Sequence, residues 1–128
     1  MNLSDKDRKQ LWAKSGNRCA ICKTELFHSN EEGNDFNIGE ECHIISSTPN
    51  GPRHIPNYGQ YDSYENLILL CCVHHKEIDD KKNVAIYPAD KLYRIKEQHE
   101  AWVRDTLENN GKKKEKDWNA IFRALDLT

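Results

Sequence analysis

Four short stretches of the chain carry side chains that bind metal ions or move protons. The first is the pair Cys19 and Cys22, and the last is Cys71-Cys72-Val73-His74-His75. Between them lie His43 and Asn66. Cysteine and histidine are the usual ligands of Zn²⁺ in proteins, and histidine titrates close enough to neutrality to take a proton from water. The sequence therefore offers two kinds of chemistry, structural metal binding and acid–base catalysis.

The cysteines predict a structural zinc site. Tetrahedral zinc sites are commonly built from pairs of ligands three residues apart, and Cys19 with Cys22 is one such pair. Two overlapping pairs farther along the chain have the same spacing: Cys71 with His74, and Cys72 with His75. Either pair completes a Cys₃His site, and spacing does not separate them. An odd total of five cysteines also favours metal ligation in a reducing compartment over a disulfide framework.

The composition is that of one soluble domain with nearly balanced charge. The chain has 128 residues, about the length of a single domain. Its 19 Lys and Arg against 21 Asp and Glu give a net charge of −2, so DNA binding must use a local basic surface or another subunit. The longest apolar run, from Leu67 to Val73, is too short to cross a bilayer, and no apolar leader is present. We expect a cytoplasmic protein without a membrane segment.

Hydrophobic periodicity and turn residues predict the elements that position these motifs. They are, in order, a helix from Ser4 to Gly16, a loop over residues 28–37, a strand over 36–45, a long loop over 46–65, a strand over 67–70, a helix over 73–80, an extended segment over 84–87 and a helix over 89–108. Asn109-Asn110-Gly111 is expected to end that helix. The predicted class is α+β, with one domain over residues 1–110.

Several charged or ionisable residues have simpler interpretations than a functional one. Arg53 and His54, in the long loop, are candidates for a phosphate contact, but a solvated loop surface explains either of them alone. His99 lies in the apolar stripe of the long helix and is interpreted as a packed histidine. Residues 111–128 are expected to form a basic linker, with the charge run Lys112 to Lys116, and a short C-terminal helix marked by Trp118, Ile121, Phe122 and Leu125.

Taken together, the motifs resemble the HNH endonuclease family. The resemblance rests on Glu-x-His-Ile, ending at His43-Ile44, and on Asn-Leu-Ile-x-Leu-Cys-x-x-His-His, beginning at Asn66. A Trp-x₃-Gly-x-x-Cys-x-x-Cys entry and a Lys-x-x-His-Glu-x-Trp helix extend it over about residues 8–103. The resemblance implies a small ββα-metal core with a structural zinc site and flanking helices.

The resemblance also implies a register for the ligands and a role for the general base. Cys71 and His74 would complete the zinc site, with His74 in place of the usual cysteine, and His75 would be left for a catalytic cation. His43 matches the histidine that acts as general base. Asn66 matches the middle asparagine, which either orients the loop carrying the base or ligates the cation.

The chain departs from the family at the position before the general base. Members often carry Asp or His there as a metal ligand, whereas this chain has Cys42. A thiolate prefers softer ions than Mg²⁺, so we interpret Cys42 as a packing residue. Asp79, four residues after His75, is a further candidate ligand. The cation shell would then be completed from the following residues: Glu40, Glu41, Asn66 and Asp79.

The resulting hypothesis is a metal-dependent endonuclease that hydrolyses phosphodiester bonds in DNA. It would use structural Zn²⁺ and a catalytic Mg²⁺ or another divalent cation such as Mn²⁺ or Ni²⁺. The resemblance implies phage defence or restriction as the setting. The net charge of −2 and the scarcity of base-reading side chains predict low intrinsic specificity and a recognition or sensor protein as partner. The alternative is a catalytically weak, zinc-stabilised module that binds nucleic acid or protein. Such a module needs neither His43 nor His75, so their presence favours the enzyme. A redox role for the CxxC pair would require a thioredoxin-like βαβ context, which the sequence lacks.

Overall fold

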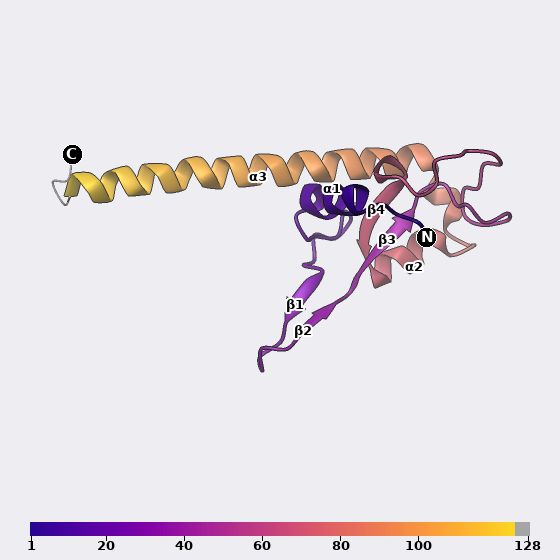
Figure 1. The fold of residues 1–128 in the computed structure, drawn as a ribbon, viewed down its shortest axis with the longest axis horizontal. Helices are drawn as coiled ribbons and strands as arrows, with labels where there is room; N and C mark the ends of the chain where they lie inside the picture. Colours follow the sequence, from indigo (N-terminus) through magenta and orange to yellow (C-terminus); the bar gives the residue numbers. More distant parts are fainter. Residues whose placement is uncertain (125–128) are drawn as a thin grey trace.

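The computed structural model describes the backbone of residues 1–124 and the side chains of residues 1–109. Its helices and strands are, in chain order, α1 (Asp5–Ser15), β1 (Phe27–Ser29), β2 (Asp35–Asn37), β3 (Gly39–His43), β4 (Leu67–Cys71), α2 (Cys72–Asp79) and α3 (Ala89–Ala124) (Figure 1). Two short 3₁₀ helices, η1 (Tyr64–Asn66) and η2 (Val84–Ile86), precede β4 and α3. The arrangement confirms the predicted α+β class.

The core is a ββα unit formed by β3, β4 and α2. The two strands are antiparallel, with Glu40 opposite Leu70 and His43 opposite Leu67. All five residues of β4 are buried, since α1 and α3 pack against this strand as well as α2. A strand covered on both faces is apolar at consecutive positions, which explains the unbroken run that precedes Cys71. The helix α2 begins directly after β4, so residues 71 to 75 pass from strand to helix without a loop.

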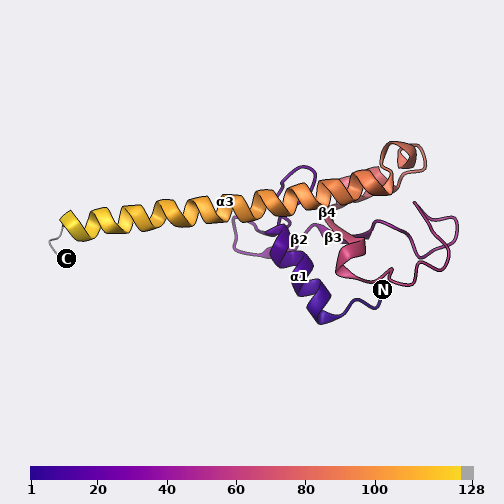
Figure 2. The same ribbon diagram turned by 90° about the horizontal axis from the view of Figure 1, so that it is seen from above.

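The helix α1 has the caps that its sequence predicts. The Ser4 hydroxyl accepts a hydrogen bond from the backbone N–H of Asp7 at 3.1 Å. Gly16 ends the helix with φ of 60° in the left-handed region. A β-carbon at Gly16 would lie 2.8 Å from Val103 Cγ1, so glycine is also required for the close approach of α3. Figure 2 illustrates how α1 lies obliquely beneath the first half of α3.

The prediction that the long helix ends at Asn109-Asn110-Gly111 is wrong, because α3 has the bounds Ala89–Ala124. A glycine inside a helix costs only about 1 kcal/mol relative to alanine, which neighbouring helix formers such as Lys112 to Lys114 can offset. The expected face of the C-terminal helix, including Leu125, lies outside the described side chains. The domain boundary at residue 110 therefore stays a prediction. Among the described residues, every helix is too short or too polar to span a bilayer.

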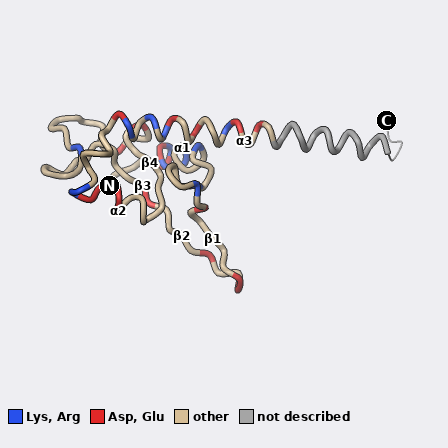
Figure 3. The backbone as a smooth tube through the Cα atoms, turned by 180° about the vertical axis from the view of Figure 1, so that it is seen from behind, with Lys and Arg blue, Asp and Glu red and all other residues tan. Residues whose placement is uncertain are grey.

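Residues 28–37, expected to be a loop, instead contain most of a β-hairpin. In it β1 pairs with β2, and His28 lies opposite Phe36. The turn is closed by the Asn30 side chain, which accepts hydrogen bonds from two backbone N–H groups, and by Gly33 with φ of 81°. The hairpin extends away from the body, and acidic residues gather at its tip (Figure 3). Its residues are polar because both faces are exposed, so no alternating pattern signals the strands.

Two further expectations are corrected in detail. The strand expected over residues 36–45 is divided, with Ile38 lying between β2 and β3. The Ile38 carbonyl accepts a hydrogen bond from Cys72 N–H at 3.0 Å, and its N–H donates to Leu26 O at 2.9 Å. These bonds join the hairpin, β3 and the start of α2. The extended segment expected over 84–87 contains η2, because its short apolar run fits a tight turn as well as a strand.

Candidate metal centre and catalytic site

One cluster of metal-binding side chains is compact enough to surround a single ion. Its members are Cys19, Cys22, Cys71 and His74, whose ligand atoms all lie within 4.8 Å of one another. The Cys22 and Cys71 sulfurs are 3.9 Å apart, and His74 Nδ1 lies 3.2 Å from Cys71 Sγ and 3.9 Å from Cys19 Sγ. Zn–S and Zn–N bonds of about 2.3 and 2.0 Å in a tetrahedron separate ligands by roughly 3.3 to 3.8 Å. The donor set and its spacing therefore fit zinc.

The turn that carries the first two cysteines is fixed by backbone hydrogen bonds. Cys19 N–H donates to Thr24 O, and Lys23 N–H donates to Cys19 O, each at 2.9 Å. Lys23 adopts the left-handed conformation, with φ of 65°. Ala20 N–H donates to Leu69 O at 3.0 Å, which attaches the turn to β4. The strand that ends at Cys71 thus also positions the opposite half of the cluster.

The charge state of the cluster is set by burial and hydrogen bonding. Burial alone would raise the pKa of Cys22, but hydrogen bonds involving Thr24 lower it to about 6. Burial raises the pKa of Cys71 to about 11. A bound cation would favour the thiolate at both positions.

Beside the cluster, Lys23 Nζ lies 2.8 Å from His99 Nδ1, and His99 Nε2 donates to Ser15 O at 2.9 Å. His99 is 1% exposed, which confirms its interpretation as a packed histidine.

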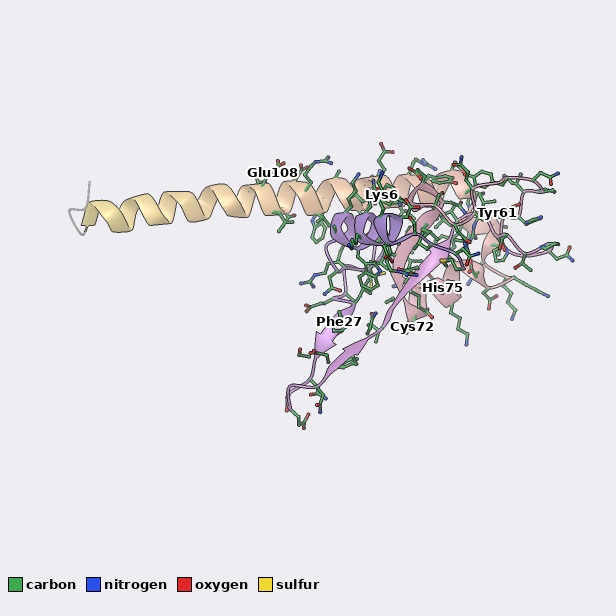
Figure 4. All side chains as sticks on the ribbon, in the orientation of Figure 1. Lys6, Phe27, Tyr61, Cys72, His75 and Glu108 are labelled. Carbon is green, nitrogen blue, oxygen red and sulfur yellow. The ribbon has the colours of Figure 1, made fainter. Side chains whose placement is uncertain are left out.

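The cluster contains Cys71 and His74, rather than the neighbouring pair of equal spacing. Cys72, labelled in Figure 4, is exposed, and His75 contacts Glu40 and Asp79 instead of the cysteines. Neighbouring residues of a helix point about 100° apart, so one CxxH pair can close the cluster while the other faces away. The structure therefore favours the register that the family resemblance implies.

His75 belongs to a second group, with Glu40 and Asp79. Its Nδ1 lies 3.1 Å from Glu40 Oε2, and its Nε2 lies 3.0 Å from Asp79 Oδ2. The hydrogen bond to Asp79, followed by that to Glu40, outweighs burial and raises the pKa of His75. Glu40 comes from β3, whereas His75 and Asp79 share one face of α2. Carboxylate oxygens and imidazole nitrogen are donors that suit a divalent cation.

Asp79 is held in place by Arg53 from the long loop. Arg53 Nη2 contacts Asp79 Oδ1 at 2.6 Å, and its Nε donates to Ile44 O at 2.7 Å. Its Nη1 donates to Ile78 O and Tyr87 O at 3.1 and 3.3 Å. Burial alone would raise the pKa of Asp79, but hydrogen bonds from His75 and then Arg53 lower it. The Arg53 side chain is 5% exposed, so both expectations for it, a phosphate contact and a solvated surface, are wrong.

His43 ends β3 and is held by a carboxylate that the sequence analysis missed. Its Nε2 lies 2.7 Å from Asp62 Oδ1, and the other Asp62 oxygen accepts a hydrogen bond from Asn2 N–H at 2.8 Å. The Asn2 bond and then the His43 bond lower the pKa of Asp62, so it is ionised at neutral pH. Because a carboxylate only accepts, the proton of a neutral His43 lies on Nε2. Nδ1 makes no hydrogen bond to any residue that the structure describes.

Asn66 is fully buried at the end of η1, directly before β4, where it joins the two ends of the long loop. Its Nδ2 donates to Ile45 O and Tyr61 O at 3.0 and 2.9 Å. Its Oδ1 accepts from Ile45 N–H at 2.9 Å and from the Tyr93 hydroxyl at 3.2 Å. These bonds occupy both amide atoms, so the geometry favours the loop-orienting alternative over ligation of a cation.

The remaining candidates for the cation shell separate along β3. Glu41 accepts hydrogen bonds from Arg8 Nε and Trp12 Nε1 at 2.8 and 2.9 Å, which directs it toward α1. Glu40 faces the opposite side of the strand, toward α2. Cys42 is 1% exposed, its Sγ donates to Glu40 O at 3.2 Å, and burial raises its pKa. Its placement agrees with the packing role expected from the sequence.

Among curated proteins, none matches the chain significantly. Among protein families, residues 19–82 match the HNH endonuclease family. That stretch is half of the 128 residues and extends from the first cysteine of the metal cluster past Asp79. The ββα unit and the Cys/His cluster lie within it. The chain therefore belongs to the HNH endonuclease family.

Proposed function

We propose that this protein is a metal-dependent endonuclease that hydrolyses phosphodiester bonds in DNA. The observation that carries the proposal is the His43–Asp62 pair, at the position of the family's general base. An imidazole that is held by a carboxylate at one nitrogen and is free at the other is suited to take a proton from water. A module that only binds would not need this arrangement.

In the proposed mechanism, His43 Nδ1 accepts a proton from the attacking water. Asp62 keeps the other proton on Nε2 and stabilises the positive charge that the ring acquires. Asn66 is a positioning residue, because its bonds to Ile45 and Tyr61 fix the chain on both sides of the pair. The water oxygen bonds to phosphorus as the bond from phosphorus to the leaving oxygen breaks, and protonated His43 then returns its proton to the leaving oxygen or to bulk water.

Two metal ions with separate roles are part of the proposal. Zn²⁺ would be bound by the Cys/His cluster and would link the turn after α1 to the β4–α2 junction. A catalytic cation, Mg²⁺ or another divalent ion such as Mn²⁺ or Ni²⁺, would be held by Glu40, His75 and Asp79. When bound, that cation would neutralise charge on the phosphate and the leaving oxygen. Arg53 keeps Asp79 ionised and in place for this role.

We further propose low intrinsic sequence specificity and a recognition or sensor protein that directs cleavage. The net charge of −2 supports this part of the proposal, because a strong electrostatic footprint for DNA is lacking. Phage defence or restriction is the setting that the family resemblance implies. Cleavage of foreign and host DNA of matched length, with and without a candidate partner, would test whether the chain itself discriminates between them.

The test of the activity is cleavage of supercoiled plasmid by zinc-loaded protein with Mg²⁺, Mn²⁺ or Ni²⁺, compared with His43→Ala. Cutting that requires the added ion and is lost in the variant supports the proposal. His28→Ala removes a histidine from the projecting hairpin and is the matched control. Absence of cutting by folded, zinc-loaded protein with every ion and with both linear and supercoiled DNA would favour the binding module instead.

A further inference from the structure

The long loop between β3 and η1 carries a group of aromatic rings that the proposed chemistry does not use. The rings of His54 and Tyr61 are nearly parallel, at 12° with centroids 6.2 Å apart. The Tyr58 ring lies 5.6 Å from that of Tyr61 at 46°. Tyr58 is 37% exposed, so its ring is available at the surface. We call His54, Tyr58 and Tyr61 the aromatic group.

The aromatic group lies beside the proposed general base. Tyr61 directly precedes Asp62, which holds His43 Nε2 at 2.7 Å. The Tyr61 carbonyl accepts a hydrogen bond from buried Asn66 at 2.9 Å. Tyr58 is attached to α3 through a hydrogen bond of 3.2 Å between its hydroxyl and that of Tyr93. The rings are therefore held at the same end of β3 as the base, where Figure 4 labels Tyr61.

The loop carries fewer acidic residues than the hairpin. Residues 44–61 contain no Asp or Glu. The hairpin also exposes aromatic rings, at Phe27 and Phe36, but its tip and second strand carry Glu31, Glu32 and Asp35. Phosphates would be repelled there by the carboxylates. The loop has one acidic residue, Asp62, which is paired with His43, so of these two surfaces it is the less acidic.

We propose that the aromatic group, with Tyr58 as its exposed member, is a stacking platform for an unpaired DNA base next to the phosphate that is cut. Its position relative to the cut rests on the proposed nuclease function, whereas base stacking does not. Bases in a duplex already stack on their neighbours, but an unpaired base has a face free for an aromatic ring. The substrate class is therefore single-stranded DNA or DNA with an unpaired segment, in preference to an intact duplex.

The test is binding without cleavage. His43→Ala protein, loaded with zinc, is titrated into a short fluorescent oligo-dT, into the same strand with abasic residues, and into a duplex of equal length. Stacking is worth enough per base that Tyr58→Leu in this background is expected to weaken binding to oligo-dT by about tenfold or more. The abasic strand, which has no ring to stack, should lose little. Tyr58→Phe, which restores the ring, should restore the affinity for oligo-dT.

Phe36→Leu is the matched control, since it removes an exposed ring from the acidic hairpin. Binding to oligo-dT should be unchanged in this variant, and melting temperatures verify that the variants fold. Equal affinity for the abasic and base-bearing strands, or equal loss on both in Tyr58→Leu, would overturn the platform. Base-dependent binding without cleavage by the unmodified protein would contradict the nuclease proposal and leave the platform standing. Cleavage by a protein whose binding does not depend on bases would support the nuclease proposal and contradict the platform.

Discussion

The Cys/His cluster and the proposed cation site at Glu40, His75 and Asp79 have neighbouring histidines and differ in construction. In the Cys/His cluster the ligand atoms already converge, and two of its cysteines, Cys19 and Cys71, are buried. In the group of Glu40, His75 and Asp79, the imidazole lies between two partly exposed carboxylates. Soft ligands that close around an ion suit a permanent structural site, whereas exposed oxygen ligands leave room for water and substrate. This difference supports the proposal that the first group stabilises the fold and that the second takes part in catalysis.

Consecutive residues of α2 belong to the two different groups. His74 and His75 are consecutive residues in the first turns of α2, and each follows a cysteine three residues earlier. Because neighbouring helical side chains point in different directions, one histidine contacts the cysteines and the other contacts Glu40 and Asp79. A short helix that starts directly from a buried strand thus contributes a histidine to each of the two groups. Substitutions at neighbouring positions should separate their contributions.

The largest effect is expected from the Cys/His cluster. Cys19→Ser should lower the free energy of unfolding by more than about 4 kcal/mol, because loss of a structural metal is among the most destabilising changes. Zinc content and thermal unfolding measure the outcome. Cys72→Ser, which alters the exposed cysteine next to the cluster, is the control and should retain both. Full zinc content in Cys19→Ser would place the metal site elsewhere.

His43→Ala should have the largest effect that is confined to catalysis. Loss of a general base costs about 10²- to 10⁴-fold in rate. Zinc content and melting temperature should change little, because the ring is partly exposed and packs outside the Cys/His cluster. Single-turnover cleavage, with His28→Ala as control, is the measurement. An unchanged rate would exclude His43 as the base.

Asp62→Asn should have a smaller effect on the same step. A hydrogen bond to a charged group contributes about 1.5–3 kcal/mol, so kcat is expected to fall by about 10- to 100-fold while KM changes little. Glu65→Gln alters a neighbouring exposed carboxylate and should leave both constants unchanged. A rise in KM without loss of kcat would mean that Asp62 contacts substrate and does not orient His43.

The smallest expected effect distinguishes the two glutamates of β3. Glu40→Gln should raise the divalent cation concentration needed for half-maximal cleavage by at least about tenfold, because it weakens the group around His75. Glu41→Gln should leave that concentration unchanged, since Glu41 is bound by Arg8 and Trp12. Cation titrations of cleavage decide between them. The same cation requirement in both variants would remove Glu40 from the proposed site.

Local spacing was enough to predict the parts of the molecule that are close in sequence. The caps of α1, the short strand before Cys71 and the CxxC and CxxH pairs are set by a few neighbouring residues each. The choice between overlapping CxxH pairs required the family resemblance, because spacing is identical. The predicted end of the long helix failed because asparagine and glycine only weaken a helix, whereas proline would break it.

Contacts across the long loop could not be predicted in the same way. Asp62 meets His43 from 19 residues away, and Arg53 meets Asp79 from 26 residues away. Hydrophobic periodicity does not predict such contacts, because an irregular loop has no repeating geometry. One signal was available for Asp62, which is the only acidic residue between His43 and Glu65. For Arg53 the sequence offered none, since a loop arginine is usually solvated.

One sample is enough to test whether the structural zinc and the catalytic cation are separate ions, as proposed. Protein carrying zinc is dialysed against a weak chelator that removes loosely bound divalent ions, and then zinc content, melting temperature and plasmid cleavage are recorded before and after Mg²⁺ or Mn²⁺ is restored. We predict one zinc per chain and an unchanged melting temperature throughout, with cleavage lost on dialysis and regained with the added ion. Cleavage that persists after dialysis would contradict separate structural and catalytic metals. So would cleavage that returns only when zinc is added back to protein that has unfolded on losing it.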